Sequence, residues 1–143
     1  MKQRRRPGTA HRVARSQLTR HAPSSIVNAS MFISGHTVYH VINQVRIEHH
    51  EKALSPDACL VREANRRARE IALKFSHTGK RFCNRSISGE NLAKGYKTTE
   101  AVKNAWLASG THKSNLLDRD YKRTGIGIYE KGGITYIVQL FSN

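Results

Sequence analysis

The sequence predicts an α+β domain in which helices pack against an antiparallel sheet. Three observations support this fold class: apolar residues recur at helical spacing from Val38 onwards, a second capped helical pattern follows Thr98, and the C-terminal segment is rich in Ile, Tyr, Val and Phe. Helices followed by paired strands are typical of a layered α+β architecture. A chain of 143 residues has room for one domain of this kind.

Two helices are predicted in the first half of this domain. The first begins at Val38 and ends near His49 or His50, and its apolar face consists of Val38, Val41, Ile42 and Val45. The second is predicted over residues 56–76, because Ser55 offers a capping hydroxyl, Pro56 suits the first helical position and Asp57 places a negative charge near the positive helix end. Its apolar face consists of Leu60, Ala64, Ala68, Ile71, Ala72 and Phe75, and the pairs Glu63 with Arg67 and Glu70 with Lys74 are expected to support the solvent face.

The second half is predicted to hold an irregular connection, one helix and a hairpin. Residues 77–98 are rich in glycine and small polar side chains, and long connections of this kind are often functional. Thr98 or Thr99 caps a third helix that Gly110 should end, with Trp106 on its apolar face as a core residue. Residues 125–130 and 135–141 are predicted to form two antiparallel strands joined by a glycine turn.

The charge of the chain is strongly positive and concentrated towards its N-terminus. There are 25 Lys and Arg against 10 Asp and Glu, a net charge of +15, and residues 1–37 hold seven basic and no acidic side chains. Residues 1–37 also lack apolar periodicity, so they are predicted to form a flexible basic tail, with the domain at residues 38–143. There are two alternatives for this segment. It could be an arm that binds nucleic acid or an anionic surface, or a targeting segment that is removed by processing. The charge favours an anionic partner but does not name one.

Cysteine usage and hydropathy place few limits on the compartment. Cys59 and Cys83 match no CxxC metal pair, and whether they bond to each other stays open at this point. No apolar run is long enough for a membrane-spanning helix. Residues 2–6 form a long basic cluster and residues 22–33 are interrupted by polar side chains, which is a poor match to a signal peptide.

Three residues are candidates for chemistry because they lie at predicted element boundaries. His77 follows the second helix, Glu90 lies in the sequence Gly-Glu-Asn-Leu, and His112 follows the third helix. Each of them alone is more typical of a capping or solvent-exposed side chain. Their succession along the chain is a stronger signal than any one of them.

That succession resembles a known family, the CAP superfamily of cysteine-rich secretory, antigen five and pathogenesis-related proteins, in its short bacterial SCP-like form. The resemblance covers residues 38–143. The matching stretches, in family order, are residues 42–46, Leu54 to Leu60, Ala64 to Ala72, Ser76-His77, Gly89-Glu90-Asn91-Leu92-Ala93, Val102 to Trp106, Ser109-Gly110-Thr111-His112, Asn115-Leu116-Leu117, Gly125-Ile126-Gly127 and Tyr136 to Phe141.

The resemblance implies a three-layer α-β-α sandwich with a shallow cleft that takes a divalent metal. His77, Glu90 and His112 match three positions of the metal-binding group, with Zn²⁺ or another divalent ion as the expected cofactor. Ser109 stands where many eukaryotic members carry a further glutamate, which leaves fewer anionic ligands for the metal. Asn91 and Asn115, whose side chains both donate and accept hydrogen bonds, are expected with Ser109 to support the cleft.

Three functions are compatible with these residues. The first is a non-enzymatic extracellular or cell-surface binding module whose cleft holds a metal, with lipid binding implied by some family members. The second is a metal-dependent hydrolase that uses His77, Glu90 and His112, although no HExxH or GxSxG motif supports catalysis. The third is a nucleic-acid-binding protein that uses the basic tail and Arg62, Arg66 and Arg69. We expect the first.

Overall fold

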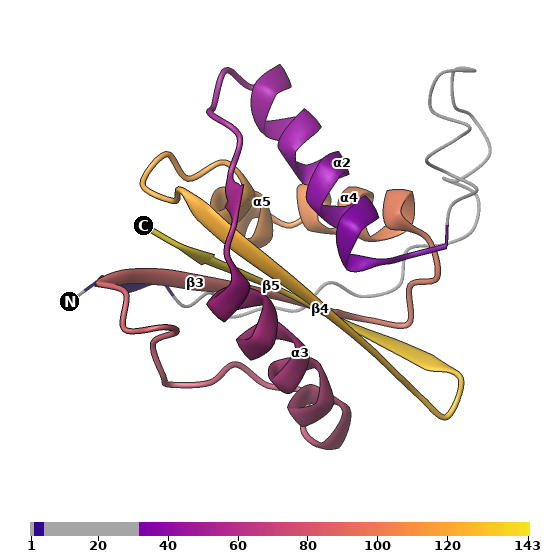
Figure 1. Cartoon of the computed structure of the whole chain (residues 1–143). Coiled ribbons are helices and arrows are strands. Elements are labelled where there is room, and N and C mark those ends of the chain that lie inside the picture. Colours follow the sequence, from indigo (N-terminus) through magenta and orange to yellow (C-terminus); the bar gives the residue numbers. More distant parts are fainter. Residues whose placement is uncertain (1, 5–31) are drawn as a thin grey trace, which may run out of the picture.

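The computed structural model describes residues 2–4 and 32–143, which fold in three layers (Figure 1). One face of a five-stranded sheet is covered by α3 (Ala58–Leu73). The opposite face is covered by α2 (Gly35–Glu48), α4 (Thr99–Ala108) and α5 (Gly110–Leu116). The predicted α-β-α sandwich is confirmed. None of the helices in the described part of the chain has the length and apolar character needed to span a bilayer.

The strand order of the sheet is β1-β3-β5-β4-β2. Its centre is antiparallel and consists of β3 (Ile87–Lys94), β5 (Ile134–Ser142) and β4 (Arg123–Lys131). Two short strands, β1 (Lys2–Arg4) and β2 (Ser55–Pro56), add to the edges in parallel. The predicted C-terminal hairpin is confirmed, and its turn uses Gly132 and Gly133 at φ of 60° and 75°, a region that favours glycine.

Two apolar cores lie on the two faces of the sheet, and β5 contributes to both. Ile137 and Phe141 pack with α2, α4 and Trp106, whereas Val138 and Leu140 pack with α3. Side chains alternate between the two faces of a strand. A strand that is covered on both faces therefore has a nearly continuous apolar sequence. Trp106 is fully buried in the first core, as its helical spacing predicted.

α3 packs unusually close to β4 because two glycines lie beneath it. A Cβ atom on Gly125 would lie 2.2 Å from the backbone of Leu60, and one on Gly127 would lie 2.2 Å from the backbone of Ala64. Backbone atoms cannot yield to such contacts as a flexible side chain can. The two glycines therefore set the distance between α3 and the sheet.

The N-terminal boundary of the folded unit differs from the prediction. α2 starts at Gly35 instead of Val38, because Ser34 caps it and Thr37 completes a capping box. Phe32 already forms an isolated β-bridge with Thr98. At the far end of the predicted tail, β1 pairs with β3. Contacts with the domain thus occur before residue 38 as well, and residues 5–31 of the predicted flexible tail lie outside the described residues.

Three predicted elements are also corrected. α3 begins at Ala58, not Pro56, because Ser55 and Pro56 pair with β4 and Asp57 becomes the cap, accepting a hydrogen bond from the Leu60 amide at 2.9 Å. The connection predicted as irregular contains β3. Gly110 was predicted to end a helix. In the structure α4 ends at Ala108, and Gly110 is the first residue of α5.

Candidate functional site

The site is built around Glu90, which projects from β3 towards α3. Glu90 is 4% exposed, and its carboxylate accepts two hydrogen bonds from Arg67 of α3. Arg67 Nε lies 2.7 Å from Oε2 and Nη2 lies 3.0 Å from Oε1. A planar guanidinium and a carboxylate match each other in this two-point arrangement, which adds directional specificity to the charge attraction.

His77 completes the group from the segment that follows α3. Its Nδ1 lies 3.0 Å from Glu90 Oε1. An ionised carboxylate only accepts hydrogen bonds, so Nδ1 carries the proton of this contact. Arg67 also donates to the carbonyl of Ser76, the residue before His77, at 2.8 Å and to Glu70 at 2.8 Å. We refer to Arg67, Glu70, His77 and Glu90 as the Arg67 cluster.

The charges of the Arg67 cluster stabilise one another. Burial raises the pKa of Glu90, but hydrogen bonds from His77 and Arg67 and the positive charge of Arg67 outweigh this effect, and the pKa lies below its ordinary value. Burial lowers the pKa of Arg67, but its contacts with Glu90 and Glu70 outweigh this effect, and the pKa lies above its ordinary value. Glu90 is therefore a structural anion held in its ionised form, not a base poised near neutral pH.

This arrangement predicts how stability depends on pH. A carboxyl group whose pKa is depressed in the folded state contributes stability above its unfolded pKa, about 4.3 for glutamate, and loses it as pH falls through the folded pKa. Wild type should therefore lose more unfolding free energy than Glu90→Gln between pH 6 and about pH 3. Urea unfolding across this range measures the difference. The control is Glu63→Gln, whose half-buried side chain pairs with Arg66 on the surface of α3. A gap between wild type and Glu90→Gln that stays constant with pH would contradict the role of Glu90.

His112 lies on α5, which covers the opposite face of the sheet from α3 (Figure 1). It is fully buried, and its backbone carbonyl accepts a hydrogen bond from Asn91 at 3.1 Å. Asn115 donates to Asn91 Oδ1 at 2.9 Å and to the Glu90 carbonyl at 3.3 Å. The two buried amides thus tie β3 to α5. Glu90 and Asn91 are adjacent on the strand and so point to opposite faces.

Ser109 lies at the junction between α4 and α5. It follows the last residue of α4 and precedes Gly110, and its hydroxyl lies 3.3 Å from that of Thr111. Its backbone amide donates to the carbonyl of Trp106 at 3.3 Å. These contacts make Ser109 part of a helix junction.

The observed contacts do not fit a divalent metal held by His77, Glu90 and His112. Both oxygens of Glu90 are occupied by Arg67, and His77 uses Nδ1 on the same carboxylate. Within residues 2–4 and 32–143, the three-residue group whose candidate ligand atoms all lie within 4.8 Å of one another is a different one, Asp57, Cys59 and Cys83. The structure therefore brings His77 and Glu90 together but does not add His112 to form a three-ligand group.

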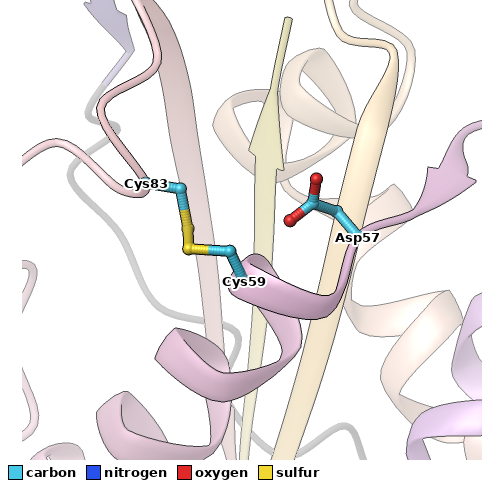
Figure 2. A group of neighbouring side chains, drawn as sticks. All are labelled: Asp57, Cys59 and Cys83. Atoms are coloured by element: carbon cyan, nitrogen blue, oxygen red, sulfur yellow. A yellow bond between two sulfur atoms is a disulfide. The ribbon is translucent and has the colours of Figure 1, made fainter.

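The group of Asp57, Cys59 and Cys83 is a disulfide beside a helix cap (Figure 2). The two cysteines are bonded to each other, with an S–S distance of 2.09 Å and a Cα–Cα distance of 6.1 Å. Their sulfurs are not thiolates, which are the form that ligates metals. Asp57 accepts from the Leu60 amide and pairs with Arg85 at 3.3 Å and Arg123 at 3.5 Å. This group is structural, and the bonding that the sequence left open is resolved.

An apolar cavity of about 320 Å³ lies between the start of α2, β2 and β4. Its size is near the lower end of the range for small-molecule sites. The lipid binding implied by the family resemblance stays a prediction. The lining residues are Gly35, His36, Tyr39, His40, Pro56, Val61, Thr124, Gly125 and Ile126.

The sequence pattern did not identify Arg67 and Arg46 as buried residues. Arg67 was assigned to the solvent face with Glu63, whereas it points inward and Arg66 pairs with Glu63 and Glu70. Its spacing from Ala64 and Ile71, three and four residues away, is the signal that places it on the buried face. Arg46 similarly follows Ile42 by four residues and donates to the carbonyls of Lys52, Leu116 and Asp118.

The fold and these contacts define a single α-β-α sandwich domain with a buried arginine-glutamate-histidine cluster beside the sheet. The family model "CAP: Cysteine-rich secretory protein family" matches residues 39–141. The chain belongs to this family. The resemblance seen in the sequence is confirmed.

Individual relatives support the fold. Uncharacterized protein YkwD of Bacillus subtilis is 45% identical over 47 residues, which is 33% of this chain and 18% of that protein. An extracellular protein with an SCP domain from Bacillus anthracis is 20% identical at a TM-score of 0.66, over 76% of this chain and 40% of the solved chain. An outer surface protein from Borrelia burgdorferi is 23% identical at a TM-score of 0.67, over 79% of this chain and 97% of the solved chain.

These likenesses differ in how much of each relative they cover. The match spans less than a fifth of YkwD, and the chain spans less than half of the Bacillus anthracis protein. At these identities, the solved structures support the shared fold and nothing finer.

Proposed function

We propose that this CAP domain is a non-enzymatic binding module that works outside the cell or at its surface and engages an anionic polymer. The observation that carries the proposal is a basic loop, residues 74–86, between α3 and β3. It contains four basic and no acidic side chains. Lys74, Lys80 and Arg81 are exposed, and Arg85 is half-buried.

The basic loop is held in place by covalent and ionic contacts. Cys83 bonds to Cys59 at the start of α3, and Arg85 pairs with Asp57. A surface held in one conformation loses less conformational entropy when it binds than a mobile one. Positive charge gathered on one surface also steers anionic partners towards it.

The Arg67 cluster supports binding over catalysis. Hydrolysis by general base catalysis needs a group whose pKa lies near the working pH. Glu90 is instead held ionised by Arg67 and His77. The Arg67 cluster therefore stabilises the fold and does not supply a general base.

Two observations support the extracellular assignment. Disulfides persist in oxidising compartments and are rare in reducing ones, and the two cysteines of this chain are bonded. Two of the similar solved structures are an extracellular protein and an outer surface protein.

Heparin, used as a model anionic polymer, tests the proposal by calorimetry between 50 and 200 mM salt. We expect affinity to fall steeply with salt, and Lys80→Gln/Arg81→Gln to reduce the slope of log affinity against log salt by about two. The matched control is Lys113→Gln/Lys131→Gln, which removes two exposed positive charges far along the chain from the basic loop. No binding at 50 mM salt, or equal losses in both double variants, would contradict the proposal.

A further inference from the structure

The Arg67 guanidinium lies where a cation ligand of Glu90 would have to lie. It covers both carboxylate oxygens, at 2.7 and 3.0 Å, and both side chains are 5% exposed. A carboxylate has about four lone-pair positions, and Arg67 and His77 already fill three of them. A metal ion could bind Glu90 only by displacing a buried hydrogen-bonded ion pair.

Arg67 is also fixed by groups other than Glu90. Nη2 donates to the carbonyl of Ser76 and Nη1 to Glu70, each at 2.8 Å. The guanidinium thus links α3, the segment that carries His77, and β3. An arginine side chain stays protonated at all physiological pH values, so its charge is permanent.

A permanent positive charge beside Glu90 has two consequences. It satisfies the buried carboxylate, which would otherwise require another cation. It also repels a second cation, and this repulsion is strong in a site from which water is excluded. The Arg67 guanidinium therefore both neutralises the Glu90 carboxylate and excludes a second cation.

We infer that Arg67 acts in this protein as the resident cation of the His77–Glu90 pair, in place of a divalent metal ion. The pair is consequently complete without metal, and removal of the Arg67 charge exposes a latent site for a transition-metal cation of the Zn²⁺ class. This inference concerns the interior of the domain and is independent of the anionic partner proposed above.

The test is calorimetry with Zn²⁺ alone on EDTA-treated protein, with thermal unfolding as a second readout. The variants are Arg67→Met, Arg67→Lys and His77→Ala, together with Arg67→Met/His77→Ala. Arg67→Met removes the charge and keeps an unbranched side chain, whereas Arg67→Lys keeps the charge and loses the two-point contact.

We expect wild type and His77→Ala to give the same heats, with no binding that depends on His77. Arg67→Met should gain a saturable Zn²⁺ site and a rise in Tm on addition of Zn²⁺, both lost in Arg67→Met/His77→Ala. Arg67→Lys should gain neither. If Arg67→Met is unfolded in EDTA, recovery of its far-UV circular dichroism on addition of Zn²⁺ reports the same gain.

Zn²⁺ binding by wild type that His77→Ala abolishes would overturn the inference, because the site would then accept metal with Arg67 in place. Failure of a folded Arg67→Met to gain binding would also overturn it, since His77 and Glu90 would then not form a cation site. The wild-type comparison remains decisive even if Arg67→Met does not fold under any condition.

Discussion

Replacement of Arg67 by Met is expected to lower the free energy of unfolding by about 3–5 kcal/mol. The variant leaves the Glu90 carboxylate buried without the cation that accompanies it, and truncation of one partner of a buried pair costs far more than the pair itself contributes. Urea unfolding at pH 7 measures the loss. The matched control is Arg66→Met on the same helix, whose side chain is 49% exposed and which should lose no more than about 1 kcal/mol.

A second variant separates the ion pair from the packing around it. Arg67→Met/Glu90→Leu removes both charges, and replacement of a buried pair by apolar groups of similar volume is often close to neutral. The double variant should therefore recover most of the stability lost in Arg67→Met. If Arg67→Met and Arg66→Met lose equal stability, or the double variant recovers none, Arg67 does not stabilise the fold by neutralising buried Glu90.

Removal of the disulfide is expected to have the next largest effect. Cys59→Ser/Cys83→Ser should lower the free energy of unfolding by about 3–4 kcal/mol, because the bond closes a loop with a sequence separation of 24 residues and restricts the unfolded chain. Chemical unfolding of the double variant measures the loss.

Wild type in excess reductant provides the control for the disulfide prediction. It should show the same loss as the double serine variant, since both lack the covalent link. An unfolding free energy within about 1 kcal/mol of wild type in both cases would show that the bond adds little to stability.

Much of the architecture was predictable because it depends on local periodicity. The apolar face from Leu60 to Ile71 and the glycine turn at residues 132–133 are local signals, and both the helix and the hairpin are confirmed. The corrected boundaries depend on contacts distant in sequence. Pro56 suits a helix start, for example, but pairs with Thr124 of β4.

β3 was missed because several of its buried side chains are polar. Glu90 and Asn91 do not alternate with apolar residues, and their side chains are satisfied in the interior by distant groups, Arg67 and Asn115. A sequence pattern cannot show those partners. The same limit applies to α5, a short helix that begins directly after Ser109.

The candidate site was predictable only in part. The family resemblance pointed to His77 and Glu90, which the structure places 3.0 Å apart. It gave no indication of Arg67, because the charge pair with Glu63 at helical spacing was a sufficient local explanation for that arginine. The inward direction of Arg67 depends on a glutamate 23 residues away, and this contact changes the chemistry of the site.

The most direct test of the account is a ¹³C NMR titration of the Glu90 carboxyl group in EDTA-treated protein. The resonance is assigned by its absence in Glu90→Gln. We expect a pKa below the ordinary glutamate value of about 4.3 in the absence of metal, and no change when Zn²⁺ is added. A pKa at or above that value in metal-free protein, which falls only on addition of Zn²⁺, would contradict the central claim that Arg67 holds Glu90 in its ionised form.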